Sequence, residues 1–106
     1  MNKLLVFLSL MLLTAGSAAA ATRTVDIRNF KFNPTPLRIH VGDSVTFVNH
    51  DNEAHTATAY DKSFDSQGLD SNDKWTHVFR KPGTYRYFCQ LHPYMKAIII
   101  VLPSKM

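Results

Sequence analysis

A segment near the C-terminus, residues 89–95 (CQLHPYM), carries three side chains that bind soft metal ions. A thiol at Cys89, an imidazole at His92 and a thioether at Met95 follow one another at three-residue intervals. Two intervening residues let the backbone turn so that successive side chains face a common centre. The segment has no carboxylate, which excludes magnesium and calcium, and structural zinc sites seldom use methionine. One thiolate, two imidazoles and a weak axial methionine bind copper in electron-transfer sites, so the segment predicts copper.

Such a site needs a second imidazole, and the sequence offers four further histidines. His40 alternates with apolar residues in an expected strand and faces solvent, and His77 has no ligand-type neighbour. His50 precedes the polar break at 51–53 and His55 follows it, at a corner between two strands that could reach the loop of Cys89. Taken alone, each of the four is more simply an ordinary surface or core histidine.

The chain from residue 24 onward consists of short β-type runs separated by turn residues, without a sustained helical period. Such runs at regular spacing predict an all-β sandwich or barrel. The continuously apolar stretch 98–102 predicts a strand buried on both faces, and Phe64 and Leu69 are expected to tie a long polar loop at 61–73 to the core. The expected strands are 24–28, 37–41, 44–49, 55–60, 74–79, 85–89 and 97–102.

The first 21 residues have the features of a secretory signal peptide. Lys3 precedes an apolar run at 4–13, and small residues with overlapping Ala-x-Ala cleavage patterns follow, so maturation should leave Ala21 or Thr22 first. The run is too short for a transmembrane helix, which needs about 20 apolar residues. We therefore predict a cleaved signal at 1–21, one domain at 22–106, export to the periplasm and no membrane span after processing.

Charge and cysteine content exclude several other classes. The 12 Lys and Arg against 8 Asp and Glu give a net charge of +4. The cations are scattered rather than clustered in a stripe, so nucleic acid is not an expected partner, although acidic proteins remain possible partners. The single cysteine cannot form an internal disulfide, and a lone thiol in an oxidising compartment needs something to occupy it.

Three groups of residues together resemble the cupredoxins, in particular small blue copper proteins of the amicyanin and plastocyanin type. They are the stretch 49–56 (NHDNEAHT), the turn 82–85 (PGTY) and the spacing of Cys89, His92, Pro93 and Met95. The resemblance extends from about residue 25 to residue 101. It implies a Greek-key β-sandwich of seven to eight strands that binds one type 1 copper ion.

The resemblance also implies roles for individual residues. The expected copper ligands are His55, Cys89, His92 and Met95. Asn49 corresponds to the asparagine that, in this family, ties its loop to the loop of the cysteine. Gln90 stands beside the cysteine where a small hydroxyl residue is usual, and Leu91 stands where amicyanin has proline. Leu91 restores a backbone N–H near the ligand loop, and hydrogen bonding around the sulfur tunes the reduction potential, so the potential of a relative does not carry over to this chain.

These features predict a periplasmic one-electron carrier, not an enzyme, that cycles between Cu(I) and Cu(II). It would act as a monomer and dock redox partner proteins transiently through the apolar residues around His92, namely Leu91, Pro93 and Tyr94. The alternative is a copper carrier or copper-tolerance protein that passes on the ion, but the chain has no Met- or His-rich tail for such transfer. A cysteine enzyme is disfavoured because no orienting residue or oxyanion motif accompanies Cys89 and His92.

Overall fold

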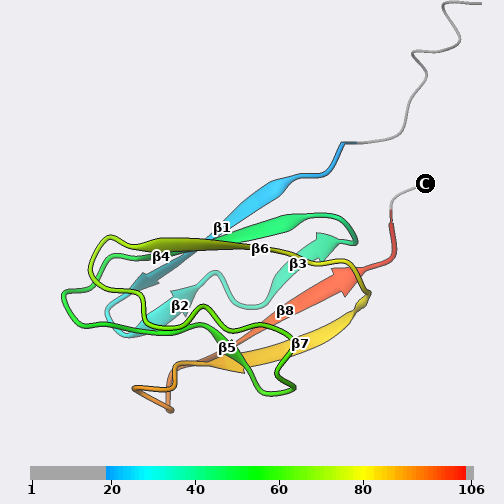
Figure 1. The fold of residues 1–106 in the computed structure, drawn as a ribbon. Coiled ribbons are helices and arrows are strands. Elements are labelled where there is room, and N and C mark those ends of the chain that lie inside the picture. The colour runs from blue at the N-terminus through cyan, green and yellow to red at the C-terminus, as the bar shows by residue number, and fades with distance from the viewer. Residues whose placement is uncertain (1–18, 105–106) are drawn as a thin grey trace, which may run out of the picture.

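The computed structural model describes residues 19–104, which form two β-sheets packed face to face (Figure 1). The predicted signal peptide lies outside the described residues, except for its last three. The strands are β1 (Thr22–Arg28), β2 (Lys31–Asn33), β3 (Leu37–His40), β4 (Ser44–Asn49), β5 (Thr58–Ala59), β6 (Lys74–Val78), β7 (Gly83–Phe88) and β8 (Lys96–Leu102). One sheet has the order β2-β1-β4-β6 and the other the order β3-β8-β7-β5. The predicted all-β sandwich is confirmed.

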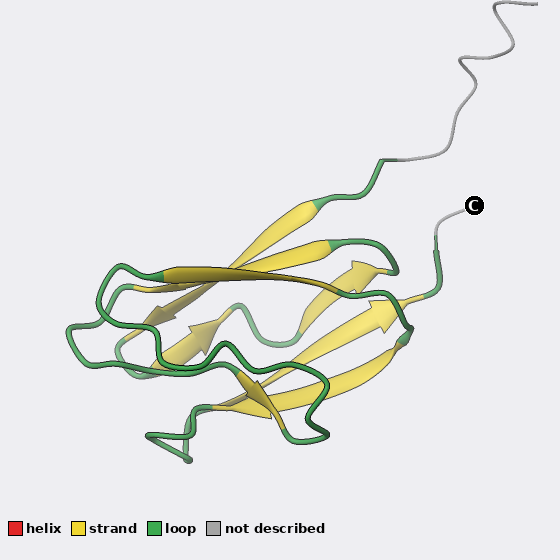
Figure 2. Cartoon of the chain, in the orientation of Figure 1, coloured by secondary structure: helices red, strands yellow, loops and turns green. Residues whose placement is uncertain are grey.

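Alternating burial along the strands explains how the two sheets form one core. In β4, Val45 and Phe47 face inward while Ser44 and Thr46 are partly exposed. The β1–β4 and β3–β8 pairs are parallel and the remaining pairs are antiparallel. Phe47 packs against Tyr87 of the opposite sheet with ring centroids 5.6 Å apart. Figure 2 shows strands and loops throughout the described part of the chain, and these residues include no helix able to span a membrane.

Two strands differ from the sequence-based expectation. The edge strand β2 was not expected, because three residues are too few to show a period of two. It follows a tight turn in which Asn29 and Phe30 adopt positive φ angles of 56° and 59°. The strand expected at 55–60 is reduced to the two residues of β5. The backbone before and within it instead forms isolated bridges to the 61–73 loop, from His55 to Leu69 and from Thr58 to Asp65.

The expectation that 98–102 is buried on both faces was wrong. Ile99 and Val101 are buried, whereas Ile98 and Ile100 are only half-buried. Ile98 lies opposite the exposed Arg86 of β7, on a sheet face that no second layer covers. An antiparallel pair can leave one face to solvent even where its sequence is apolar throughout.

The long loop at 61–73 is fixed to the sandwich as predicted. Phe64 and Leu69 are both buried in the core. Phe64 packs edge-on against Phe79 with a centroid distance of 5.4 Å. The main chain of Leu69 exchanges two hydrogen bonds with that of His55, at 3.0 and 2.8 Å. This pairing is one of the contacts that fix the backbone at His55.

At the start of β1, the described N-terminal segment is joined to the β3–β4 turn. The Ala21 amide donates to the Oδ1 atom of Asp43 at 2.8 Å, and the Ala21 carbonyl accepts the Ser44 amide at 2.9 Å. Asp43 is buried and its second oxygen accepts the amide of His40 at 2.9 Å. Hydrogen bonding between the N-terminal segment and the β-sheet therefore begins at Ala21.

His77 provides a prediction for the pH dependence of stability. Burial, together with the charge of Arg80, lowers the pKa of His77 below its usual value of 6.5. The native state therefore favours the neutral ring, and this contribution to stability is complete above pH ~6.5 and lost as the pH falls through the lowered pKa. We expect the free energy of unfolding of the metal-free protein to fall between pH 7.5 and 5, and to fall less in His77→Phe.

Urea unfolding at several pH values measures this effect. Arg80→Gln serves as the matched variant, because it removes only the second cause and should reduce the pH dependence by a smaller amount. Equal pH dependence in the wild type and in His77→Phe would contradict the prediction.

Candidate metal centre

Three connections meet at one end of the sandwich. They are the β7–β8 loop at residues 89–95, the β4–β5 loop at 50–57 and the β1–β2 turn at 29–30 (Figure 1, left end). The β7–β8 loop begins and ends in two paired strands, since Phe88 lies opposite Lys96. Positions within this loop are therefore set by the sheet.

The backbone of the β7–β8 loop forms successive turns that explain its ligand spacing. The His92 amide donates to the Cys89 carbonyl at 3.3 Å, and the Met95 amide donates to the His92 carbonyl at 2.9 Å. The Cys89 amide donates to the Met95 carbonyl at 3.2 Å and closes the loop. Each three-residue step is thus one turn, and Cys89, His92 and Met95 recur at equivalent places in it.

His55, Cys89 and His92 bring three donor atoms together. Cys89 Sγ lies 3.7 Å from the Nδ1 atom of His55 and 3.7 Å from that of His92. The two Nδ1 atoms lie 3.1 Å apart. Among the described Cys, His, Asp and Glu side chains, these three residues form a group whose ligand atoms all lie within 4.8 Å of one another.

This arrangement fits a single metal ion. Metal–nitrogen and metal–sulfur bonds are about 2.0–2.3 Å long, so three donors around one ion lie roughly 3.5 Å apart. The observed separations of 3.1 and 3.7 Å bracket that value. A thiolate and two imidazoles, together with the buried thioether of Met95 at the end of the cysteine loop, are the donor set of a type 1 copper site.

Burial distinguishes one ligand candidate from the others. His55 and Cys89 are fully buried, with 0% of their surface exposed, and Met95 is 2% exposed. His92 is partly exposed and has the exposed residues Leu91 and Pro93 on either side. The imidazole of His92 is therefore the candidate ligand that reaches the molecular surface.

Asp51 orients the ring of His55. The Oδ2 atom of Asp51 lies 2.9 Å from Nε2 of His55. Because a carboxylate only accepts hydrogen bonds, Nε2 carries the proton and Nδ1 presents its lone pair to Cys89 and His92. Burial alone would raise the pKa of Asp51, but hydrogen bonds from Phe30, Asn29 and His55 outweigh it and lower the pKa below 3.8. The carboxylate is therefore charged at neutral pH.

The same carboxylate fixes the β1–β2 turn beside the site. Its two oxygens accept the amides of Asn29 and Phe30, at 2.7 and 2.8 Å. The Phe30 ring then packs edge-on against both His55 and His92, with centroid distances of 4.9 Å in each case. Asp51 thus holds one imidazole directly and places an aromatic ring against both.

Thr56 joins the two loops that carry the donors. Its amide donates to Cys89 Sγ at 3.3 Å, and its hydroxyl accepts the amide of Gln90 at 2.8 Å. Gln90 takes part through its backbone, while its side chain is exposed. The two hydrogen bonds fix the position of the Cys89 sulfur relative to the loop of His55.

The hydrogen-bond partners of the Asn49 side chain differ from those that the cupredoxin resemblance implied. Its fully buried side chain donates to the carbonyls of Glu53 and Leu69, at 2.8 and 2.9 Å, and accepts the amide of Asp51 at 2.9 Å. These contacts fix the β4–β5 loop and join it to the 61–73 loop. The hydrogen bonds to the cysteine loop come from Thr56 instead.

The three other histidines lie away from this cluster. His50 pairs with Asp26 at 2.8 Å, and His77 stacks on Trp75 with a centroid distance of 5.4 Å. His40 ends β3. Sequence reasoning set these three aside as candidates for the second imidazole, but it required the family resemblance to select His55.

Asp51, Phe30 and Thr56 were missed by the sequence analysis as functional residues. Asp51 lies 22 and 21 residues from the two turn amides that it binds. No local spacing signals such contacts, because the parallel β1–β4 pairing brings the segments together. The only local signal was the four-residue separation of Asp51 and His55 within one polar break.

Removing the Asp51 carboxylate should weaken metal binding. In Asp51→Ala the buried Nε2–H of His55 and two turn amides lose their acceptor, so the imidazole and Phe30 are no longer fixed. We expect a copper affinity lower by about 10- to 100-fold, measured by competition with a chelator. Asp61→Ala is a suitable control, because Asp61 accepts the Ser63 amide in an exposed turn and should leave the affinity unchanged. Equal affinities in the two variants would contradict this role.

Comparison with known proteins agrees with the geometry of the site. The Cupredoxin-like domain family matches residues 3–101. The chain is 33% identical over 89 residues to amicyanin-alpha of Methylorubrum extorquens, with 79% of this chain and 75% of the relative covered. It also matches the solved structure of an amicyanin mutant in its oxidised state, with 26% identity, a TM-score of 0.70, and 76% and 81% of the two chains covered.

One similar structure belongs to an enzyme. The copper-containing nitrite reductase of Thermus scotoductus SA-01 is 35% identical with a TM-score of 0.71, and the match covers 76% of this chain. The chain spans only 22% of that enzyme, so the match concerns one domain of it. The sandwich, the soft donor set and the match over residues 3–101 agree with one another: this chain belongs to the cupredoxin family, whose cofactor is one type 1 copper ion.

Proposed function

We propose that this protein is a periplasmic electron carrier whose copper ion is held by His55, Cys89, His92 and Met95. The observation that carries the proposal is the convergence of two nitrogens and one sulfur, 3.1–3.7 Å apart, from loops that are hydrogen-bonded to each other. When bound, copper supplies a one-electron Cu(I)/Cu(II) couple.

The protein's part is to keep the donors nearly still while the charge changes. Thr56, Asp51 and the Leu69 backbone restrain the two loops, and burial keeps water away from Cys89 and His55. Because the donors are preorganised, little has to move when an electron arrives or leaves. His92 provides the path for the electron, since it is the candidate ligand that reaches the surface.

Residues around His92 form the proposed docking patch for redox partners. Leu91 is 55% exposed and Tyr94 is 68% exposed, with Pro93 between them also exposed. Small apolar patches of this kind suit transient electron-transfer encounters. The proposal includes cleavage of residues 1–21, a mature domain from residue 22, and action as a monomeric carrier rather than as an enzyme.

Adding Cu(II) to the processed protein tests the function. We expect one equivalent to bind with an intense blue charge-transfer band, and the protein to accept and return one electron reversibly in cyclic voltammetry. A pale complex that binds copper but does not cycle would overturn electron transfer and favour copper carriage. Failure to bind copper would overturn both.

The axial role of Met95 gives a second prediction. Met95→Gln replaces a soft thioether by a harder oxygen donor, which stabilises Cu(II) relative to Cu(I). Copper should stay bound, the charge-transfer spectrum should shift, and the reduction potential should fall. Met95→Leu, which keeps the volume without a donor, is the control for packing. If neither the spectrum nor the potential changes in Met95→Gln, Met95 is not a ligand.

A further inference from the structure

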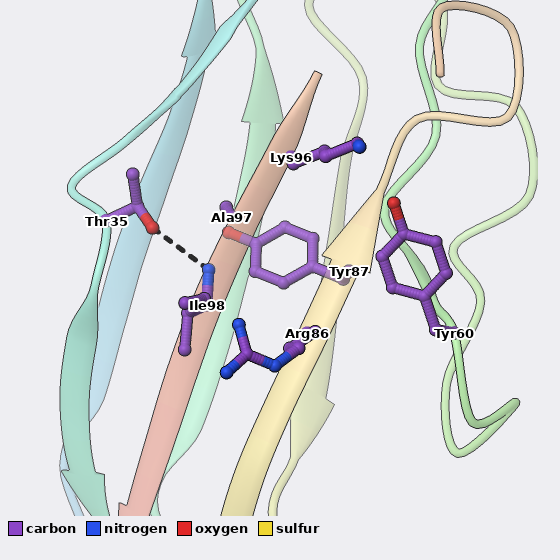
Figure 3. Close-up of a pocket in the computed structure, with 7 residues that line it drawn as sticks. All are labelled: Thr35, Tyr60, Arg86, Tyr87, Lys96, Ala97 and Ile98. Carbon is purple, nitrogen blue, oxygen red and sulfur yellow. Dashed lines mark hydrogen bonds between the residues drawn. The ribbon is translucent and has the colours of Figure 1, made fainter. Parts of the chain in front are cut away.

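Two open grooves on the surface of the sandwich meet at Thr35 and Lys96. The first, of about 480 Å³, lies over β7 and β8, with Tyr60 at its edge (Figure 3). The second, of about 390 Å³, lies between the β1–β2 turn and the β7–β8 loop, where Tyr94 and Met95 line it. Because both grooves include Thr35 and Lys96, they form one continuous surface.

Charged residues on this surface are all positive. Lys31 lines the second groove, Arg86 the first and Lys96 both, and no acidic residue lines either. All three cations are exposed, and Figure 3 shows Arg86 and Lys96 beside the same groove. The carboxylates of Asp26 and Asp51, in the described part of the chain, pair with His50 and His55 and not with any of these three cations. We call this surface the basic face, defined by Lys31, Thr35, Tyr60, Arg86, Tyr94 and Lys96.

Two exposed aromatic rings flank the basic face. Tyr60 is 51% exposed at one end and Tyr94 is 68% exposed at the other. Aromatic residues are enriched at protein interfaces, because a rigid ring buries a large area at small entropic cost. The face thus combines apolar anchors with a positive field.

The basic face lies near the metal centre at two places. The ring of Tyr60 stacks on Phe88, with centroids 4.4 Å apart and planes at 16°. Phe88 is bonded directly to Cys89. In the second groove, Met95 itself forms part of the lining. A partner that covers both grooves would therefore lie close to two of the proposed ligands.

We propose that the basic face docks an acidic redox partner protein, which widens the docking surface beyond the patch at Leu91, Pro93 and Tyr94. This inference rests on the proposed electron-carrier function. The positive field attracts an acidic surface and sets its orientation, while the tyrosines supply apolar contact. A second copy of this chain is a poor occupant, because its net charge is also positive, +4 for the whole sequence.

Charge reversal in each groove tests the docking site on the copper-loaded, reduced protein. Lys31→Glu alters the second groove and Arg86→Glu the first. Lys81→Glu is the matched control, because it changes the net charge equally but lies in the β6–β7 connection, at the opposite end from Cys89. Stopped-flow oxidation by anionic ferricyanide is compared with oxidation by the tris(phenanthroline)cobalt(III) cation, and reduction potentials are measured to correct for driving force.

The two groove variants should slow the reaction with ferricyanide by about 3- to 10-fold at low ionic strength, with little change in Lys81→Glu. The cobalt cation should react with the groove variants at least as fast as with the wild type. A second series uses plant-type ferredoxin, an acidic one-electron donor, as the protein probe for the oxidised form. Its rate should fall in the same two variants and with added salt.

Two results would overturn the proposal. Equal slowing in all three variants would mean that only net charge matters. Unchanged ferredoxin rates, with groove-dependent sedimentation on vesicles containing phosphatidylglycerol, would assign the face to a membrane surface instead. Both results are obtained on protein that shows the blue band and reversible electron transfer. Each of them therefore contradicts the docking site and leaves the proposed function intact. Loss of the band in the wild type would instead contradict the proposed function.

Discussion

Cys89→Ser is expected to abolish the blue charge-transfer band of the copper-loaded protein. The band of a type 1 site arises from a thiolate bound to Cu(II), and Cys89 is the single cysteine of the chain. No other residue of the chain carries a thiol. Copper that still binds to His55 and His92 should give a pale complex whose reduction potential differs from that of the wild type.

The protein should remain folded in this variant. A serine hydroxyl can accept the Thr56 amide in place of the sulfur, which does so at 3.3 Å. We expect a loss of about 1–2 kcal/mol in the free energy of unfolding, measured with urea on the metal-free protein. A variant that keeps an intense blue band would show that Cys89 is not the copper thiolate. A variant that fails to fold would be replaced by Cys89→Ala in the same measurement.

Asn49→Ala should cause the largest loss of stability outside the apolar core. The side chain is fully buried and makes three hydrogen bonds to main-chain groups of Glu53, Leu69 and Asp51. Alanine removes all three, so the Glu53 carbonyl and the Asp51 amide lose this partner while the Leu69 carbonyl keeps only the amide of His55. Each lost hydrogen bond costs about 1 kcal/mol. We expect a total loss of about 2–4 kcal/mol in the metal-free protein.

The loss should extend to copper binding, because the loops that Asn49 joins also hold the backbone of His55. Asn52→Ala is the matched control, since Asn52 belongs to the same loop but is exposed, and it should change stability by less than about 0.5 kcal/mol. Urea unfolding and chelator competition measure the two effects. Similar stabilities for the two variants would show that the buried amide does not hold the loops.

The sequence allowed the local part of the site to be predicted. Cys89, His92 and Met95 lie within seven residues, and the turns that space them are formed inside the same loop. Soft donor chemistry then indicated copper without knowledge of the fold. Burial of Phe64 and Leu69 was likewise predictable, because isolated apolar residues in a polar loop need a core to cover them.

The non-local part of the site could not be predicted in the same way. His55 approaches Cys89 across 34 residues, and Asp51 binds the turn at residues 29 and 30. Both contacts depend on strand pairing, in which many registers are compatible with one pattern of apolar residues. The outer face of β8 is a related case. Its apolar sequence does not reveal that no second layer covers this face, where Ile98 lies opposite the exposed Arg86.

If the predicted signal peptide is removed, the hydrogen bond between Ala21 and Asp43 would change in strength. In the precursor, the donor at 2.8 Å is a neutral peptide group. Cleavage after Ala20, one of the two predicted positions, would turn that nitrogen into the α-ammonium of a new first residue. A hydrogen bond between two ionised groups is roughly twice as strong as one between neutral groups. Cleavage there would therefore replace a neutral hydrogen bond at the start of β1 by an ion pair between the new α-ammonium group and Asp43.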